Sequence, residues 1–276
     1  MEQKIMTSYT TRGTALITGA STGIGAVYAD RLARRGYDLI LVARDRVRLD
    51  ELASRLSTTT GRKIDVIAAD LTVKADLRRV EERLKTDPSI SALVNNAGFG
   101  ATKPLAASDI DDLEKMIELN VTALTRLTSA VVPNLISRAD GMIINIASIA
   151  ALAPEVLNGT YAGTKSYVLT FSQSLHHELA PKGIRVHVVL PGATSTDFWD
   201  RAGVPVQHLP SEIVMPVEEM VDAALAGLDQ GELVTIPALP NAEDWAIFDA
   251  ARVALGPNLS RKSAAPRYQQ ASAAKV

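Results

Sequence analysis

Tyr161 and Lys165 are the two side chains whose chemistry and spacing point most directly to catalysis. They stand four residues apart in a stretch that we predict to be helical, so both project from one helix face. A tyrosine hydroxyl has a pKa of about 10, and a nearby ammonium lowers that pKa by stabilising the phenolate. Such a tyrosine can give a proton to a carbonyl oxygen or accept one from an alcohol. An isolated pair with this spacing is more often an ordinary helical tyrosine and a surface lysine.

A glycine-rich turn lies between the first predicted strand and the first predicted helix, and reads Thr18-Gly19-Ala20-Ser21-Thr22-Gly23-Ile24-Gly25. Glycines let the backbone approach a pyrophosphate, and the helix N-terminus offers free N–H groups and the positive end of its dipole. The spacing is G-x3-G-x-G instead of the commoner G-x-G-x-x-G. A plain strand-to-helix turn is the alternative, but three glycines at this junction favour nucleotide binding.

Arg44 follows the second predicted strand, at the place that selects between the two nicotinamide dinucleotides. NAD-binding folds carry an acidic residue at the end of this strand, which binds both ribose hydroxyls. Here that place is taken by Ala43, and an arginine follows that can form forked, charge-assisted hydrogen bonds with a 2′-phosphate. We therefore expect NADP(H). The alternative is that Arg44 and Arg46 only solvate a helix start, and Asp45 comes one residue too late for the ribose position.

Polar residues also follow the other predicted strands. The third strand is followed by Asp70-Leu71, where the carboxylate either accepts from an adenine amino group or caps the next helix. The later strands are followed by Asn95-Asn96-Ala97-Gly98, by Ser148, and by Pro191-Gly192 with Thr194 and Thr196. Ligands of open parallel sheets bind at these carboxyl ends, so we expect the groups to meet there.

The elements that position these residues follow from short apolar segments alternating with amphipathic ones. We predict strands at Thr14–Thr18, Asp38–Ala43, Ile64–Ala68, Ala92–Asn95, Met142–Ile146, Arg185–Leu190 and Leu233–Ile236. We predict helices at Gly23–Arg35, Arg46–Thr58, Lys74–Lys85, Asp109–Ser137, Tyr161–Leu179, Val217–Leu228 and, as a last piece, Asn241–Leu255. Wholly apolar strands separated by helices indicate an α/β fold with a doubly wound, Rossmann-type parallel sheet of about seven strands and helices on both faces.

The domain organisation is expected to be simple, because the 276 residues suit one large α/β domain and show no internal linker or repeat. We expect a flexible lead at residues 1–12, one dinucleotide-binding catalytic domain at 13–255, and a poorly ordered tail at 256–276. The irregular segment at 198–215 contains Phe198 and Trp199. Because these side chains are unfavourable in water, we interpret it as an apolar lid over the substrate instead of a plain surface loop.

Composition excludes several other classes of protein. Lysine and arginine number 29 against 31 acidic residues, which argues against a charge-driven nucleic-acid or membrane-surface role. The chain has no cysteine, hence no disulfide or thiolate metal site, which fits a reducing cytoplasm. No apolar run reaches the roughly 18 residues of a membrane span. His176 and His177 are neighbours that face different ways, and no metal-ligand spacing occurs, so we expect no metal.

Taken together, these motifs make the chain resemble the short-chain dehydrogenase/reductase family over roughly Thr14–Pro237. The matching motifs are TGASTGIG at Thr18–Gly25, NNAG at Asn95–Gly98, Asn120, Ser148, Tyr161-Ala162-Gly163-Thr164-Lys165 and Pro191-Gly192. The resemblance implies that Tyr161 is the acid/base and that Lys165 lowers its pKa and holds the nicotinamide ribose. It implies that Ser148 binds the substrate oxygen and that Asn120 supports a proton-relaying water. It further implies a cofactor site made of Thr18, Gly19, Ser21, Thr22, Gly23, Ile24, Gly25, Arg44, Asp70, Leu71, Asn96, Ala97, Gly98, Tyr161, Lys165, Pro191, Gly192, Thr194 and Thr196.

The resulting expectation is an NADP(H)-dependent oxidoreductase that interconverts a ketone or aldehyde and an alcohol, with a small-molecule substrate that the sequence does not identify. Its pocket is expected to draw on Ala151–Gly159, Phe99-Gly100 and the lid. Family members often pack the helices corresponding to 109–137 and 166–179 between subunits, so we expect a homo-oligomer, a dimer or tetramer. The alternatives are a non-catalytic nucleotide sensor, which needs only the cradle, and an epimerase or dehydratase, whose larger C-terminal substrate domain does not fit the residues after Pro237.

Overall fold

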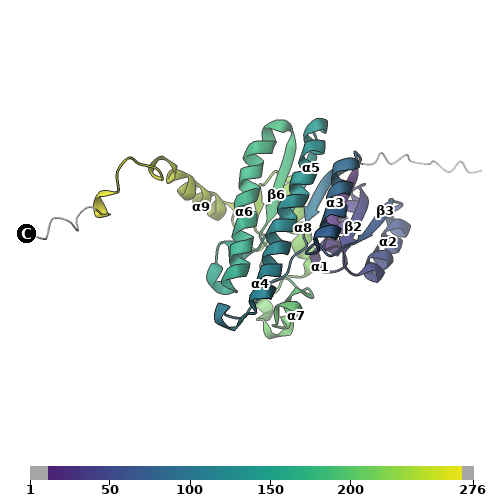
Figure 1. The fold of residues 1–276 in the computed structure, drawn as a ribbon, viewed down its shortest axis with the longest axis horizontal. Coiled ribbons are helices and arrows are strands. Elements are labelled where there is room, and N and C mark those ends of the chain that lie inside the picture. The colour runs from purple at the N-terminus through teal and green to yellow at the C-terminus, as the bar shows by residue number, and fades with distance from the viewer. Residues whose placement is uncertain (1–11, 269–276) are drawn as a thin grey trace, which may run out of the picture. The chain divides into compact units, whose positions relative to one another are not determined.

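The computed structural model describes residues 12–268, and within them seven parallel strands form one sheet in the order β3-β2-β1-β4-β5-β6-β7 (Figure 1). Their bounds are β1 (Thr14–Thr18), β2 (Asp38–Ala43), β3 (Ile64–Ala68), β4 (Ile90–Asn95), β5 (Gly141–Ile146), β6 (Ile184–Val189) and β7 (Val234–Thr235). The strand order reverses between β1 and β4, which lie side by side. This reversal is where open α/β sheets bind ligands beyond the carboxyl ends of their strands.

Helices cover both faces of the sheet because neighbouring strand residues point to opposite sides. Ile17 of β1 belongs to the core under α1 (Gly23–Arg34), α2 (Arg46–Thr60) and α8 (Val217–Asp229). Its neighbour Leu16 belongs to the other core, under α3 (Lys74–Thr86), α5 (Leu124–Arg138) and α6 (Gly159–Leu179), the helices at the front in Figure 1. The predicted doubly wound parallel sheet is confirmed.

The predicted helix over 109–137 is not continuous. It consists of α4 (Ile110–Ile117), a π-helical turn (Glu118–Ala123) and α5. The predicted lid at 198–215 is not wholly irregular either, because it contains α7 (Phe198–Ala202) and 3-10 turns at Val206–His208 and Ser211–Ile213. Other 3-10 turns lie at Leu105–Ala107, Ile149–Ala151, Pro154–Val156 and Ala180–Lys182. A single π-helical turn inserted in an α-helix changes the spacing of apolar residues over only a few positions, so the sequence pattern alone does not reveal it.

The contacts within the chain divide it into two units, one ending at Pro237 and the other starting at Ala238. The sheet and the predicted site residues all lie in the first unit. The predicted domain extended to residue 255, but α9 (Ala242–Ala254) belongs to the second unit and has no buried residue. Of the predicted terminal segments, residues 1–11 and 269–276 lie outside the described residues, and 256–268 contain 3-10 turns at Gly256–Asn258 and Pro266–Tyr268.

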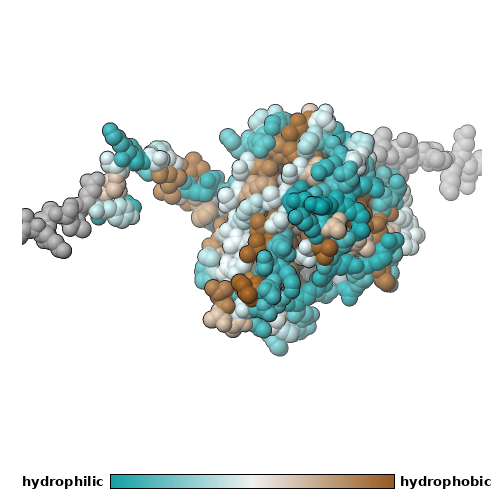
Figure 2. All heavy atoms as spheres, viewed as in Figure 1, coloured by the Kyte–Doolittle hydropathy of each residue, from teal (hydrophilic) through white to brown (hydrophobic). Residues whose placement is uncertain are grey.

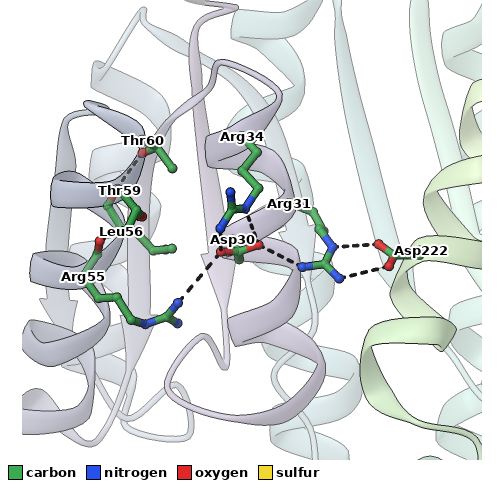
Figure 3. A network of polar contacts seen from close by, with 8 residues as sticks. All are labelled: Asp30, Arg31, Arg34, Arg55, Leu56, Thr59, Thr60 and Asp222. Carbon is green, nitrogen blue, oxygen red and sulfur yellow. Dashed lines mark hydrogen bonds and ion pairs between the residues drawn. The ribbon is translucent and has the colours of Figure 1, made fainter.

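A buried carboxylate, Asp30 of α1, ties three helices together (Figure 3). It accepts hydrogen bonds from Arg31 and Arg34 at 2.9 Å, and Arg55 of α2 lies 3.9 Å away. Arg31 also forms a forked pair with Asp222 of α8, at 2.7 and 2.9 Å. Burial raises the pKa of Asp30, but the hydrogen bonds from Arg34 and Arg31 outweigh it and hold the pKa below its ordinary value of 3.8.

Asp30→Asn is expected to lower the free energy of unfolding by about 1–2 kcal/mol, because it leaves three partly exposed arginines without their shared carboxylate. Urea titration at pH 7 measures the loss. Since the folded pKa lies below the unfolded one, the wild-type contribution is complete above about pH 4 and disappears as the pH falls through the folded value. The variant should therefore approach the wild type in acid. Asp50→Asn, which breaks the exposed pair with Arg46, is the control and should change stability by less than about 0.5 kcal/mol; an equal loss in both variants would contradict the assignment.

Candidate active site

The glycine-rich turn forms the predicted cradle at the carboxyl end of β1. Thr22 is the N-cap of α1 without a side-chain hydrogen bond to the helix, and the first turn of α1 holds no acidic residue. The first amide groups of the helix therefore keep their capacity to bind an anion. Gly19 and Gly23 have φ angles of +66° and +56°, which other residues rarely adopt.

The glycines also keep this turn free of side chains. A Cβ atom at Gly25 would overlap the carbonyl oxygen of Gly19, and one at Gly19 would lie 2.7 Å from Nδ2 of Asn96. That amide donates to the carbonyl oxygens of Thr18 and Gly19, at 2.9 and 3.2 Å. Oγ1 of Thr18 in turn accepts from the N–H groups of Asn96 and Ala97 at 3.0 Å. The predicted motifs after β1 and β4 thus form one rigid structure, with a surface of bare backbone that suits a dinucleotide pyrophosphate.

The two arginines after β2 differ in their partners. Nε of Arg46 binds both carboxylate oxygens of Asp50, at 2.9 and 2.7 Å. Arg44 is exposed and forms no ion pair or hydrogen bond with a side chain among residues 12–268. Asp45 caps α2 by accepting from the N–H of Arg48, at 3.1 Å, so it serves the helix. Arg44 is thus the arginine at this strand end that keeps its guanidinium available for a phosphate.

Asp70 and Leu71 lie beyond the end of β3, as predicted, and are already engaged. Oδ1 of Asp70 accepts from the backbone and the hydroxyl of Thr72, at 3.0 and 2.7 Å. The N-cap of α3 is Val73, so Asp70 closes a turn and does not occupy the cap position itself. Leu71 is buried in the core with Leu16. Contact of either residue with an adenine stays a prediction.

The segment after β6 runs from the residues next to Ser148 to the glycine-rich turn. The carbonyl oxygen of Pro191 accepts from the N–H of Ile149, at 3.0 Å, and Thr194 donates to the carbonyl oxygen of Gly192, at 3.1 Å. A Cβ atom at Gly23 would lie 3.1 Å from Cγ2 of Thr196. Residues 191–196 and the start of α1 are therefore neighbours in space although they are about 170 positions apart in the chain.

Tyr161 and Lys165 lie on one face of α6, as their spacing predicts, and both are buried. The hydroxyl of Ser148, which follows β5, forms a hydrogen bond with Tyr161. Nζ of Lys165 donates to the carbonyl oxygen of Ile146 at 2.9 Å and lies 5.7 Å from the centre of the Tyr161 ring. The end of β5 thus brings a hydroxyl, a phenol and an amine into one buried site.

The pKa values in this site differ from the expectation. Burial raises the pKa of Tyr161 to about 12, and the hydrogen bond from Ser148 acts in the lowering direction. Burial lowers the pKa of Lys165 to about 8. The lowering of the Tyr161 pKa expected from Lys165 is not found, because burial dominates and the amine donates to Ile146 instead of the phenol oxygen. Tyr161 is therefore a protonated donor at neutral pH.

Asn120 lies in the π-helical turn between α4 and α5, a feature that is frequent at functional sites. Its amide donates to the carbonyl oxygen of Phe99 and to Thr164, at 2.9 and 3.1 Å, and its oxygen accepts from the N–H of Phe99, at 3.1 Å. A Cβ atom at Gly98 would lie 2.9 Å from Oδ1 of Asn120 and 3.6 Å from Nζ of Lys165. The glycine therefore leaves space near both the amide and the amine, and the proton-relaying water implied for Asn120 stays a prediction.

A buried polar network behind the site was missed at the sequence level. Nδ2 of Asn95 donates to Thr128 and to Asn145, at 3.0 and 2.9 Å, and Asn145 donates to Ser172, at 2.9 Å. These side chains join β4 and β5 to α5 and α6. Of the four, only Asn95 belongs to a motif recognised in the sequence, the one at Asn95–Gly98. The others are single polar residues in apolar segments, a signal that does not reveal their partners.

Phe198, in the predicted lid segment, packs against Tyr161, the predicted acid/base residue. The two ring centres are 5.8 Å apart, and Trp199 packs edge-on against Phe198 at 5.4 Å. Tyr161 belongs to an apolar cluster with Leu113 and Met116 of α4, further formed by Ala150, Ala162, Phe99, Ala101, Leu157 and Phe198. The predicted lid segment therefore contributes an aromatic wall to the site.

Other kinds of site are not found in the part of the chain that the structure describes. No group of three His, Asp or Glu side chains among residues 12–268 is arranged to hold a metal ion. No helix in this range has the length and apolar composition needed to cross a bilayer.

Solved structures of two bacterial enzymes share this architecture. A short-chain dehydrogenase from Sphingobium yanoikuyae, in complex with NADPH, is 50% identical with a TM-score of 0.90, over 93% of this chain and 99% of that one. A bulky-bulky ketone specific alcohol dehydrogenase from Comamonas testosteroni is 48% identical with a TM-score of 0.86, over 94% and 99% of the two chains.

Sequence relatives agree in family. The very-long-chain 3-oxoacyl-CoA reductase of Anas platyrhynchos is 36% identical over 187 residues, and the matched region spans 66% of this chain but only 60% of that protein. An uncharacterized oxidoreductase of Staphylococcus epidermidis is 31% identical over 210 residues, 72% of this chain and 88% of the relative. The family model for short chain dehydrogenases matches residues 13–204. The predictions of the fold and of an oxidoreductase family are confirmed: the chain belongs to the short-chain dehydrogenase family.

Proposed function

We propose that the protein is an NADP(H)-dependent oxidoreductase that interconverts a ketone or aldehyde and an alcohol, with Tyr161 as the proton donor and acceptor. The observation that carries this proposal is the buried group of Tyr161, Ser148 and Lys165 at the same sheet edge as the glycine cradle. A nucleotide sensor would need only the cradle, so the intact catalytic group favours the enzyme.

The cradle at residues 18–25 and the backbone at 96–98 are proposed to hold the pyrophosphate and the neighbouring riboses. Lys165 would bind the nicotinamide ribose, Thr194 and Thr196 would lie near the nicotinamide, and Arg44 would bind the 2′-phosphate. When bound, NADPH supplies the hydride for the carbonyl carbon.

Ser148 and Tyr161 are proposed to orient the substrate and to move the proton. Their hydroxyls both donate toward the carbonyl oxygen and stabilise the negative charge that develops on it. Tyr161 then transfers its proton to that oxygen, and the raised pKa of the phenol keeps this proton in place at neutral pH. Lys165 and Asn120 both lie close to Gly98, and we propose that together they return a proton to Tyr161.

Arg44→Ala is expected to raise the KM for NADPH about tenfold or more and to leave the KM for NADH within about twofold, because only the first cofactor loses a charge-assisted bidentate contact. Initial rates with both cofactors measure this. Arg46→Ala is the matched control, since Asp50 already engages that guanidinium. Equal increases in KM for both cofactors would remove the basis for NADP(H) selectivity at Arg44.

The apolar cluster around Tyr161 supports substrates with apolar groups on both sides of the carbonyl, and the Comamonas enzyme is specific for bulky-bulky ketones. The direct test offers the purified protein NADPH with small aliphatic ketones, aryl ketones, aldehydes and acyl thioester ketones, and follows NADPH absorbance. Consumption with an apolar ketone is the expected result; no consumption with any carbonyl would contradict the proposal.

We also propose that the protein is a cytoplasmic homo-oligomer, a dimer or tetramer. The lack of cysteine suits a reducing compartment. Figure 2 shows hydrophobic residues at the surface over α5 and α6. Within these helices Ile136 and Tyr167 are both 36% exposed. The ring of Tyr167 stacks on Phe171 at 5.6 Å, which gives this face a rigid aromatic pair that suits a symmetric contact. Light scattering on the purified protein tests the assembly.

A further inference from the structure

We infer that Gly100 and Phe198 together set which carbonyl substrates the enzyme prefers. Because Gly100 has no side chain, the Phe198 ring can pack on it and cover Tyr161; we call this packing position the seat of the ring. A bulky substrate group must take the place of that ring. This inference rests on the proposed function and adds to it a residue pair that determines substrate size.

Gly100 lacks a side chain for a steric reason. Its φ angle is not in the left-handed region, so its backbone conformation is open to other residues. A Cβ atom at this position would lie 2.5 Å from Cζ of Phe198, 3.1 Å from Cε2 of the same ring, and 3.2 Å from Cδ2 of Tyr161. The contact that excludes a side chain is therefore the lid ring, which packs directly on the glycine.

The lid that carries this ring is held by hydrogen bonds that do not involve the ring. Nε1 of Trp199 donates to the carbonyl oxygen of Thr194, at 2.9 Å, and Thr102 donates to the carbonyl oxygen of Ala202, at 2.7 Å. Met215, the last residue of the lid, also forms a β-bridge with Thr194, which precedes the lid. Phe198 contributes only apolar packing to this arrangement through its ring. The ring can therefore leave its seat while the hydrogen bonds that hold the lid remain.

The surroundings of the ring decide what can replace it. Leu113, Met116 and Leu157 line the same apolar cluster as Tyr161 and Phe198. An aryl or branched alkyl group of a ketone can regain these contacts when it displaces the ring. A small ketone cannot fill that volume, and instead depends on the seated ring to exclude water from the carbonyl. Seating of Phe198 thus favours small substrates, and its displacement favours large ones.

The test is a double-mutant cycle of Gly100→Ala and Phe198→Ala, assayed with NADPH and two ketones, one small and aliphatic and one carrying two bulky aryl groups. The ratio of kcat/KM, bulky over small, is expected to rise roughly tenfold in Phe198→Ala. It is expected to rise in Gly100→Ala as well, because the added methyl group pushes the ring off its seat. In the Phe198→Ala background the second substitution should change nothing further.

Two outcomes of the cycle would overturn the inference: a ratio unchanged in Phe198→Ala, or an effect of Gly100→Ala that is equally large in both backgrounds. Gly256→Ala is the control, since a Cβ atom there meets no described atom within 4 Å, and its ratio should match the wild type. If none of the tested carbonyl compounds made the wild-type protein consume NADPH, the proposed function would be contradicted instead.

A fluorescence measurement decides the seating of the ring independently of activity. The chain has two tryptophans, Trp199 and Trp245. In a Trp245→Phe background the emission reports Trp199, which packs on Phe198. Gly100→Ala is expected to shift this emission toward the red, as the displaced ring exposes the indole. An unchanged spectrum would show that the added methyl group does not move the ring, and the inference would be wrong.

Discussion

Tyr161→Phe is expected to reduce turnover by about 10³-fold or more, in the range that a positioned acid/base residue contributes, while NADPH binding stays within about threefold of wild type. The hydroxyl is proposed to exchange a proton with the carbonyl oxygen, and in the variant Ser148 would be the one remaining donor of the two. The ring itself packs against Phe198, so phenylalanine preserves the shape of the site.

Steady-state assays give the loss of turnover, and titration of NADPH fluorescence gives the affinity. Tyr167→Phe is the matched control on the same helix, because that hydroxyl only bonds Thr125 on the surface, at 2.8 Å. The mechanism would be untenable if Tyr161→Phe retained comparable activity. A parallel loss of NADPH binding would instead mean that the hydroxyl holds the cofactor site together.

Lys165→Met is expected to reduce turnover by about 100-fold or more and yet to stabilise the fold at pH 7. The amine is proposed to hold the nicotinamide ribose and to return protons to Tyr161, and both functions are lost. Burial, however, lowers the pKa of Lys165 from 10.5 to about 8. The charged form at pH 7 therefore opposes folding by up to about 3 kcal/mol, which the bond to Ile146 partly offsets. We expect a net gain of about 1–2 kcal/mol, a trade of stability for function.

Urea titrations at pH 7 and pH 10 test the stability part of this prediction. Between pH 8 and 10.5 the unfolded wild type binds more protons at this lysine than the folded one, so wild-type stability rises with pH over that window. The advantage of Lys165→Met should therefore shrink at pH 10. Lys182→Met, which alters an exposed lysine near Glu178, should change neither activity nor this pH dependence. If the variant were destabilised at pH 7, the free-energy cost of burying the lysine charge would be smaller than the stabilisation from the contacts that the lysine makes.

The strands could be predicted nearly to the residue because each is a short apolar segment bounded by glycine or polar residues. Thr14–Thr18, Asp38–Ala43 and Ile64–Ala68 have the predicted bounds. The position and shape of the glycine-rich turn were equally predictable, since they depend on local backbone freedom and on a helix start, both encoded by adjacent residues. The end of the first unit at Pro237 was not, because α9 has an ordinary helical sequence and only the contacts show that it belongs to the following unit.

The pKa values in the site could not be predicted from the sequence, because they depend on tertiary contacts. A lysine four residues from a tyrosine suggests a lowered tyrosine pKa, but the balance depends on what buries the phenol and on what the amine binds. Those partners, Phe198 and the carbonyl of Ile146, come from distant parts of the chain. Likewise, the π-helical turn that presents Asn120 depends on its bonds with Phe99 and Thr164.

By itself, the sequence determined the residues on which the proposed chemistry rests: a tyrosine, a serine and a lysine with the spacings of the family motifs, a glycine-rich turn, and an arginine after Ala43. These are local properties, since residue type, helix periodicity and strand ends depend on residues that are close together in the chain. Only the tertiary structure decided how the site is enclosed. The seat at Gly100 and the ring of Phe198 are about a hundred positions apart, and their contact arises because the sheet brings the loop after β4 and the lid after β6 to the same edge.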